Sequence, residues 1–203
     1  MSTKERQVRS VASNFITRED GEDLRIEGHF AVFNSNYTIA DGLTESVAPG
    51  AFTDTLGGDV RALIDHDTRL VLGRTQAGTL ELREDDKGLW GSIKINPKDQ
   101  DAMNLYARVQ RGDVNQCSFG FFPLEEKTEK REDGSVHWTI TKADLREVSC
   151  CTFPAYQETN ISARKADAEL IRKREADAWK LRQKQRLEAI RHGVKSADDE
   201  KED

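Results

Sequence analysis

The chain has 203 residues, of which 36% are hydrophobic and 33% charged, and its formal net charge at pH 7 is −6. This length predicts one domain of ordinary size with an appendage, and the acidic balance gives no general reason to expect nucleic-acid binding. No apolar run approaches the roughly 18 residues that span a membrane, and the N-terminus lacks the apolar stretch of a secretory signal. Three cysteines without C-x-x-C spacing argue against a disulfide framework or a structural zinc site, and they indicate a reducing compartment.

Predicted strands dominate the first half of the chain. Polar and apolar residues alternate in 6–16 and 22–33, and the turn residues 19–21 between them predict a hairpin. Residues 34–58 are predicted to be irregular, with a short helix starting near Pro49. The remaining strands predicted in this half are 59–65 and a second hairpin of 78–83 with 88–95.

The second half begins with the clearest predicted helix, 99–111. Its apolar residues fall at helical spacing, and Gly112 ends it. Ser118 lies on the next predicted strand. A charged, solvated excursion follows at 124–134, and the last predicted strands are 137–141 and 145–151.

Many short strands with one or two helices predict an α+β domain, with a small, mostly antiparallel β-barrel-like core and flanking helices. We assign this domain to residues 1–163 and a charged, helical or disordered tail to residues 164–203. Residues 165–195 carry ten Lys and Arg against five Asp and Glu, around an incomplete apolar stripe. Such a helix either docks on a partner or is solvated, and the last eight residues are predicted to be disordered.

His66 is the candidate general base, because it ends the apolar run 60–65 and a strand end fixes the backbone of such a group. Asp65 and Asp67 flank it, so a surface histidine beside two carboxylates is the alternative. The Asp-His-Asp sequence also suggests a metal, but no further His or Cys lies at a useful spacing. Neither a metal nor a cofactor is therefore expected.

Ser118 is the candidate nucleophile, since a serine hydroxyl becomes reactive when a base lies within hydrogen-bond reach. Its neighbour Cys117 points to the opposite face of a strand and is the mirror-image candidate, although free cysteine is more often a small core residue. Cys150 is a third candidate. The segment does not match the G-x-S-x-G spacing of the α/β-hydrolases.

Glu147 is the candidate third member of a triad. A carboxylate in the otherwise apolar strand 145–151 needs a partner, and holding the second ring nitrogen of His66 would satisfy it. The alternative is an ion pair with Arg146 or with another surface cation. The competing third members are Asp65, Asp67 and His137.

The chain resembles the prohead (capsid maturation) serine proteases of tailed bacteriophages, which are related in fold to the herpesvirus assemblins. The resemblance covers most of residues 20–163, and the order and spacing of several short segments carry it. These segments are 28–33, 45–52, 62–67 with 72–74, 84–89, 109–112, 117–121, 147–149 and 154–156.

The resemblance implies that His66 and Ser118 are the catalytic histidine and serine. The herpesvirus relatives use a second histidine as third member, for which His137 is the candidate, whereas the phage members favour the acidic Glu147. The implied mechanism passes through an acyl-enzyme and needs an oxyanion hole of backbone N–H groups. Candidates for that hole are Gly120, the turn at Gly73 and Arg74, and the loop after Pro154.

The resemblance also implies partners and a location. The substrate is scaffold, or the scaffold-like segment of the major capsid protein, inside an immature procapsid in the host cytoplasm, and the protease also cleaves itself. A homo-oligomer formed through the helix 99–111 is suggested by analogy with the dimeric herpesvirus relatives, and neither nucleic acid nor a membrane is expected as a partner. The alternative is a non-enzymatic capsid assembly or scaffold protein with the same fold.

Overall fold

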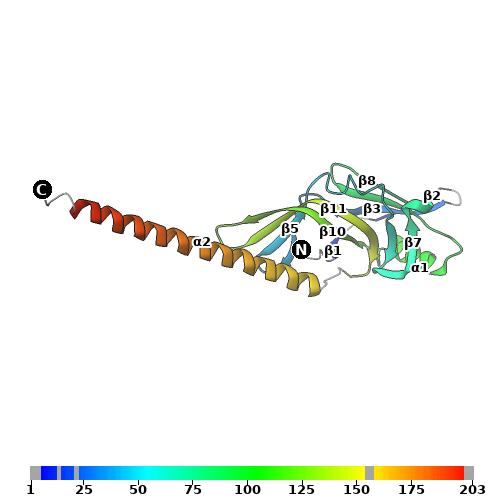
Figure 1. Cartoon of the computed structure of the whole chain (residues 1–203). Coiled ribbons are helices and arrows are strands. Elements are labelled where there is room, and N and C mark those ends of the chain that lie inside the picture. Colours follow the sequence, from blue (N-terminus) through cyan, green and yellow to red (C-terminus); the bar gives the residue numbers. More distant parts are fainter. Residues whose placement is uncertain (1–5, 13–14, 21–22, 154–157, 199–203) are drawn as a thin grey trace. The chain divides into compact units, whose positions relative to one another are not determined.

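The chain divides into two compact units, residues 1–161 and 162–203. The first unit contains two β-sheets and the helix α1, and the second is helical (Figure 1). The computed structural model describes residues 6–12, 15–20, 23–153 and 158–198.

The larger sheet has seven strands, with a long antiparallel hairpin of β10 and β11 at its centre. β1 pairs with the outer edge of β10. The other edge of β11 pairs in parallel with β5 along its first half and with β6 along its second half, while β4 and β7 flank these two. The strands are β1 (Gln7–Ala12), β4 (Tyr37–Ala40), β5 (Leu43–Val47), β6 (Arg61–Ile64), β7 (Asp67–Arg74), β10 (Gln116–Lys130) and β11 (Val136–Cys151).

The smaller sheet is antiparallel throughout, in the order β2-β3-β9-β8. Its β8–β9 pair confirms the hairpin predicted around residues 84–88. A single 3-10 turn, η1 (Thr75–Ala77), connects β7 to β8. The strands are β2 (Ile16–Asp20), β3 (Asp23–Val32), β8 (Leu80–Glu84) and β9 (Gly88–Lys94).

The predicted helix is confirmed as α1 (Gln100–Arg111). The Asp99 carboxylate caps its N-terminus by accepting from the backbone N–H groups of residues 101 and 102, and Gly112 ends it at φ 87°. Its buried face supplies Ala102, Leu105, Tyr106 and Val109 to the core.

One hydrophobic core joins both sheets and α1, and the alternation of β10 decides which of its side chains enter it. Phe119 and Phe121 point inward, with ring centroids 5.2 Å apart, and Phe119 also lies 5.6 Å from Phe52. All three rings are fully buried. Successive side chains of a strand point to opposite faces. Because Phe119 faces the core, the side chain of Ser118 just before it faces the other side of the sheet.

The predicted hairpin of 6–16 with 22–33 is wrong in its first strand. β2 is the antiparallel partner of β3, while β1 pairs with β10 in the larger sheet. Alternation identifies a half-buried strand, but it carries no information about which strand lies alongside.

Two further predictions are corrected in the segment between β3 and β8. Residues 34–58 contain the hairpin β4–β5, turned at Gly42 with φ 69°, and a series of hydrogen-bonded turns in place of the predicted helix near Pro49. Residues 67–74, for which no strand was predicted, form β7. The strands β4 and β5 have only four and five residues, and the pairing of β5 with the longer β11 stabilises them more than their own composition does.

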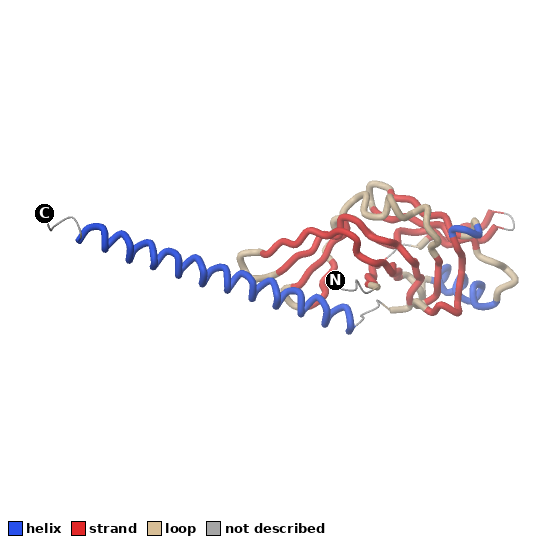
Figure 2. The backbone as a smooth tube through the Cα atoms, in the orientation of Figure 1, coloured by secondary structure: helices blue, strands red, loops and turns tan. Residues whose placement is uncertain are grey.

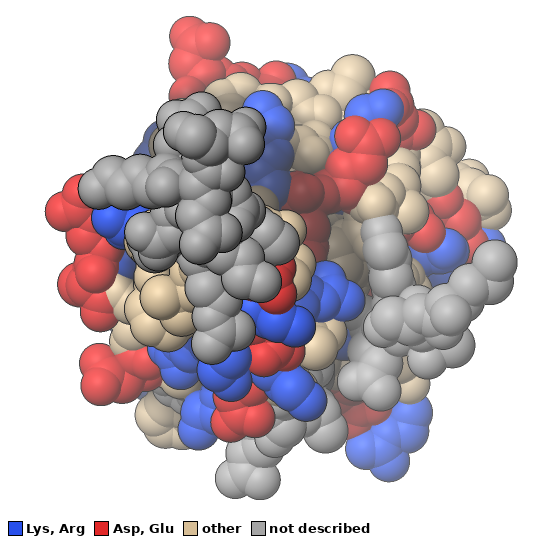
Figure 3. Space-filling view, turned by 60° about the vertical axis from the view of Figure 1, so that its left-hand side comes forward, with Lys and Arg blue, Asp and Glu red and all other residues tan. Residues whose placement is uncertain are grey.

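The charged segment 124–134 is solvated as predicted, but most of it is strand. Its first part is the exposed end of β10, and the two strands predicted at 137–141 and 145–151 form the single strand β11 with register shifts against β10. Acidic and basic side chains are interspersed on the face shown in Figure 3.

The strands and helices together place the chain in the predicted α+β class. Among the described strands both sheets remain open, so the barrel-like arrangement stays a prediction.

Gly88 is required by a close backbone approach between β9 and β3. A Cβ atom at this position would lie 2.0 Å from the carbonyl oxygen of Ala31. We expect Gly88→Ala to lower the free energy of unfolding by on the order of 3 kcal/mol, because main-chain atoms of a paired strand must shift. Urea unfolding followed by tryptophan fluorescence measures it.

Gly57→Ala is the matched control for this substitution, since no atom lies within 4 Å of a Cβ built there. Its unfolding midpoint should stay close to that of the unsubstituted chain. Equal midpoints for the two variants would show that the β3–β9 contact is not as close as described.

The second unit consists of the single helix α2 (Glu158–Asp198), drawn as one continuous blue tube in Figure 2. Ion pairs one turn apart, such as Lys180 with Asp177 at 3.7 Å, lie along it, and apolar side chains including Trp179 are exposed. Of the last eight residues, 196–198 form the end of α2 and 199–203 lie outside the described residues, so the disorder of this segment stays a prediction. In the described part of the chain, no helix is both long enough and apolar enough to cross a membrane.

Candidate active site

His66 lies in the tight turn between β6 and β7. Ile64 pairs with Asp67, so Asp65 and His66 form a two-residue loop, and both have positive φ angles, 47° and 62°. This is the backbone pattern of a type I′ hairpin, which Asp tolerates better than a bulky residue does. A histidine held in the left-handed region stores strain of the kind that collects at functional sites.

The Asp65 carboxylate ties this turn to the end of β11. Its two oxygens accept from the N–H of Thr152 at 2.8 Å and from its hydroxyl at 3.2 Å, and its own N–H donates to the carbonyl of Cys150. The neighbouring Asp67 accepts instead from Arg69, which lowers the pKa of Asp67 to about 2. Neither flanking carboxylate therefore holds the His66 ring.

Glu147 on β11 holds the His66 ring, as predicted from its place in an apolar strand. His66 Nδ1 lies 2.6 Å from Glu147 Oε1, and both side chains are largely buried. An ionised carboxylate only accepts hydrogen bonds, so Nδ1 is the donor, and in the neutral imidazole the lone pair is then on Nε2. This tautomer leaves Nε2 available as a base.

Ser149 holds the second oxygen of the carboxylate. Its hydroxyl donates to Glu147 Oε2 at 2.6 Å and lies 3.4 Å from His66 Nδ1. Residues 147 and 149 are two apart on a strand, so both side chains reach the same face. Of the predicted alternatives, the ion pair between Glu147 and Arg146 is not formed, because Arg146 pairs with Asp144 at 2.5 Å, whereas an ion pair with another cation, Arg6, is formed at 2.6 Å.

Ser118 lies on the neighbouring strand, directly opposite Ser149 in the β10–β11 register. Its side chain is fully buried, and its hydroxyl donates to the backbone carbonyl of Arg9 on β1 at 2.8 Å. Among the described residues no hydrogen bond joins Ser118 to His66. The structure thus links His66 with Glu147 directly, and Ser118 is one strand away on the same face of the sheet.

A β-bulge and a glycine shape the surface between these strands. Gly120 pairs with Glu147, but Phe121 pairs with Leu145, so Arg146 is an extra residue in β11. Bulges of this kind redirect side chains and are common beside active sites. A Cβ on Gly120 would lie 2.3 Å from Glu147 Oε1, so only glycine leaves room for the carboxylate.

Arg6, at the start of β1, also binds the catalytic candidate Glu147. Its Nη2 lies 2.6 Å from Oε1, the oxygen that accepts from His66. Arg6 is about one-third exposed, so water reaches this ion pair from one side. One carboxylate oxygen therefore serves both a histidine and an arginine.

The cysteines favour a serine over a thiol as nucleophile. Cys117 is fully buried, and its sulfur contacts carbonyl oxygens in the core, the nearest being that of His29 at 3.1 Å. Burial raises the pKa of Cys150 well above its usual value. Cys151 Sγ lies 3.8 Å from His66 Nε2, but burial, followed by Asp65 and Glu147, raises its pKa to about 12. A thiol with such a pKa stays protonated at neutral pH and is a poor nucleophile.

His137, the other competing third member, is occupied elsewhere. Its Nδ1 lies 2.8 Å from the hydroxyl of Thr44 and its Nε2 2.9 Å from that of Ser46. Burial, together with the nearby Arg131, lowers its pKa, so it stays neutral at pH 7. No cluster of metal-binding side chains is found among the described residues.

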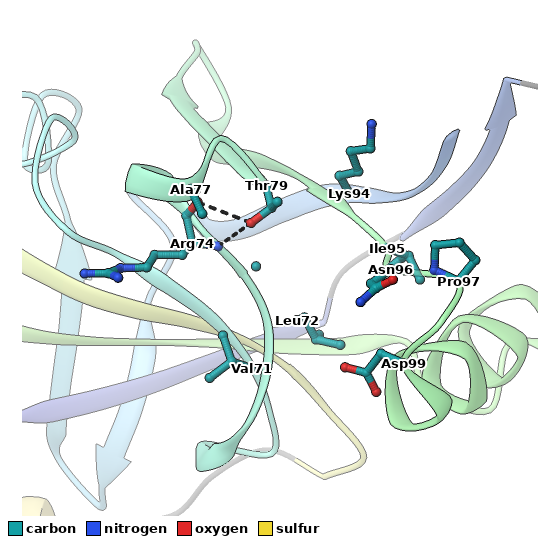
Figure 4. Close-up of a pocket in the computed structure, with 11 residues that line it drawn as sticks. Val71, Leu72, Arg74, Ala77, Thr79, Lys94, Ile95, Asn96, Pro97 and Asp99 are labelled. Carbon is teal, nitrogen blue, oxygen red and sulfur yellow. Dashed lines mark hydrogen bonds between the residues drawn. The ribbon is translucent and has the colours of Figure 1, made fainter. Parts of the chain in front are cut away.

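The candidates for an oxyanion hole are not equivalent. The N–H of Arg74 is engaged, because it donates to Thr79 Oγ1 at 2.9 Å (Figure 4). The loop after Pro154 lies outside the described residues, and Gly120 lies beside Glu147 on the face that carries Ser118. Gly120 itself lies within β10, which pairs with β1 on one edge and with β11 on the other.

A pocket of about 450 Å³ opens elsewhere on the unit, between β7, the end of β9 and the start of α1 (Figure 4). None of the three predicted catalytic residues lines it. The residues that do are Val71, Leu72, Gly73, Arg74, Ala77, Thr79, Lys94, Ile95, Asn96, Pro97 and Asp99.

Sequence reasoning missed two side chains at the site, Ser149 and Arg6. The spacing Glu-x-Ser on a strand is a signal that could have indicated Ser149, because it puts the hydroxyl next to the carboxylate. Nothing in the sequence indicates Arg6, since its contact with Glu147, 141 residues away in the chain, depends on β1 pairing with β10.

Comparisons with known proteins show the family to which the chain belongs. Residues 13–174 match the family model described as caudovirus prohead serine protease. Over 164 residues the chain is 32% identical to the prohead protease of Enterobacteria phage HK97, which covers 79% of this chain and 68% of that protein. The solved structure of the bacteriophage T4 capsid assembly protease, gp21, is similar in fold, with a TM-score of 0.51, 11% identity, and coverage of 74% of this chain and 98% of that one.

Proposed function

The chain belongs to the caudovirus prohead serine protease family, and we propose that Ser118, His66 and Glu147 are its catalytic residues. The observation that carries the proposal is the 2.6 Å hydrogen bond between His66 Nδ1 and Glu147 Oε1. A buried carboxylate that fixes the imidazole and leaves Nε2 basic is the support that a serine nucleophile needs. Ser118 lies one strand away, opposite Ser149.

Catalysis requires Ser118 Oγ to exchange its present acceptor, the Arg9 carbonyl, for His66 Nε2. Nε2 then takes the hydroxyl proton as Oγ attacks the peptide carbonyl, and a tetrahedral intermediate forms. The imidazolium gives this proton to the leaving amine as the C–N bond breaks, which leaves the acyl-enzyme, and His66 next activates the water that hydrolyses the ester. Glu147 stabilises the imidazolium, and Ser149 keeps the carboxylate in position.

The substrates that we propose are the scaffold and the scaffold-like segment of the major capsid protein, within the procapsid in the host cytoplasm, together with the protease itself. Family membership supports a role in capsid maturation. Association of copies through α1 and docking of the tail 164–203 on a capsid partner belong to the same proposal. The charged surface of α2 supports a docking role.

Co-expression with the major capsid protein of the same phage tests the function. We expect intact mass spectrometry to find a truncated capsid protein, a truncated protease, or both, and the new termini give the cleavage sites. Capsid protein expressed alone is the control. Full-length masses for both proteins after co-expression would contradict the proposal and favour a non-enzymatic assembly protein.

A further inference from the structure

The N-terminal strand β1 lies where a protease would hold an extended substrate. It pairs antiparallel with β10 from Gln7 opposite Phe121 to Ala12 opposite Gln116, along the strand that carries Ser118. Proteins commonly bind extended peptides by adding them to such a sheet edge. β1 is also the last strand of its sheet, with β10 as its single paired neighbour among the described strands.

The backbone of β1 engages the proposed nucleophile itself. The Ser118 hydroxyl donates to the Arg9 carbonyl at 2.8 Å, and Ser118 is fully buried with β1 in place. A buried hydroxyl bonded to a carbonyl of the neighbouring strand can reach neither water nor a substrate. The family match covers residues 13–174 and does not include β1.

Arg6 fastens the start of β1 to the catalytic carboxylate. Its guanidinium binds Glu147 Oε1 over Gly120, and a Cβ at Gly120 would lie 2.9 Å from Arg6 Nε. Arg6 Nε is buried and has no hydrogen-bond partner within the described part of the chain. A partly satisfied, partly buried arginine is a costly arrangement, so this contact is one that can be released.

Arg9 fills a site built for a basic side chain. Its guanidinium binds both oxygens of Glu45, at 2.6 and 3.0 Å, and lies 5.9 Å from the ring centroid of Phe121. Glu45 is fully buried, and a buried carboxylate is costly without a cation beside it. A substrate strand that replaces β1 therefore needs a basic side chain at the position of Arg9.

We propose that β1 is an internal stand-in for the substrate, and that the edge of β10 between Gln116 and Phe121 binds extended peptides carrying Lys or Arg opposite Glu45. This inference rests on the proposed function, since it assigns β1 a role by its contact with Ser118. In the state described here, β1 covers the nucleophile and Arg6 holds Glu147. Release of β1 frees the edge of β10 for a substrate strand and uncovers Ser118 at the same time.

A fluorophosphonate probe, which reacts with an activated serine, measures how often the site is open in the full-length chain. Arg6→Glu places a like charge beside Glu147, and we expect Ser118 to be labelled about tenfold faster or more, because labelling follows the open fraction. Arg18→Glu makes the same charge change at an exposed position on β2 of the smaller sheet, where Arg18 pairs with Glu27, and should stay near the unsubstituted rate. Equal rates for Arg6→Glu and the unsubstituted chain would overturn the inference.

A disulfide lock tests the same idea in the opposite direction. Val11 is the register partner of Cys117, a spacing that a cross-strand disulfide can bridge, so Val11→Cys would fasten β1 to β10. We expect the oxidised variant to resist labelling and the reduced variant to recover it. Labelling of Ser118 at equal rates in both states would show that β1 does not cover the site.

A synthetic peptide of residues 6–12, added to the Arg6→Glu variant, should slow the labelling, and the same peptide with Arg9→Ala should do so less. Equal inhibition by the two peptides would remove the basic-residue requirement. An absence of any adduct on Ser118 in every variant is a different result. It would refute the proposed function, and this inference with it, whereas labelling that ignores β1 would refute this inference alone.

Discussion

Ser118→Ala is expected to abolish cleavage of the co-expressed capsid protein, with a loss on the order of 10⁶-fold in turnover. Removing the hydroxyl removes the bond to be formed with the substrate, and no other described side chain can replace it. The Ser149 hydroxyl is also near His66, but it donates its hydrogen bond to Glu147. The ring nitrogen that it approaches, at 3.4 Å, is Nδ1, which donates to Glu147 and cannot act as a base.

Two further serine substitutions make this test discriminating. Ser149→Ala should lower turnover by at most about 100-fold, because it only loosens the carboxylate that positions His66. Ser92→Ala should keep full activity, since Ser92 is buried in the smaller sheet and donates to Glu27. Full activity of Ser118→Ala together with complete loss in Ser149→Ala would reverse the assignment of the nucleophile.

Ser118→Ala also removes the hydrogen bond to the Arg9 carbonyl, and this change alone costs about 1 kcal/mol of stability. Urea unfolding of the variant separates the two effects. A variant that unfolds near the normal midpoint and leaves the capsid protein intact has lost chemistry and kept its fold.

Glu147→Gln is expected to lower turnover by about 10³- to 10⁴-fold. The amide is nearly the same size as the carboxylate, so it fits beside Gly120. Its oxygen can still accept from His66, and its amino group can donate to Ser149, whose hydroxyl is able to accept. What is lost is the negative charge that stabilises the imidazolium in the transition state.

Single-turnover cleavage of a capsid-derived peptide measures this loss, and Glu84→Gln is the control. Glu84 accepts from the backbone N–H of Phe52 and takes no part in the site, so its substitution should leave the rate unchanged. A Glu147→Gln variant with nearly normal turnover would mean that the buried pair with His66 is structural, and the third catalytic role would have to be assigned again.

Local patterns predicted some elements well. α1 was predictable because one cap, one glycine and a 3.6-residue apolar spacing all lie within its own sequence. The β8–β9 hairpin was predictable because its two strands and the turn between them also lie within one short stretch of sequence. The pairing of His66 with Glu147 could be expected because a carboxylate in an apolar strand needs a partner, and a histidine at a strand end can provide one.

The features that were missed depend on contacts distant in sequence. The pairing of β1 with β10, and the contact of Arg6 with Glu147, join parts of the chain that lie more than 100 residues apart. β5 likewise has a distant partner, because the residues of β11 that pair with it follow 93 positions later. The turn that carries His66 was read as the end of a strand, because composition does not reveal that two successive residues adopt positive φ.

β1 belongs to the same chain as β10, and this attachment determines the concentration that a substrate needs in order to displace it. A strand tethered by a short connection presents itself at an effective concentration in the millimolar range. A separate peptide must approach that concentration, or make more contacts, before it displaces β1. Dilute encounters outside a shell therefore leave β10 filled, whereas many substrate copies crowded around one protease favour exchange. Covalent attachment of one short strand would thus make proteolysis depend on confinement without a separate inhibitor.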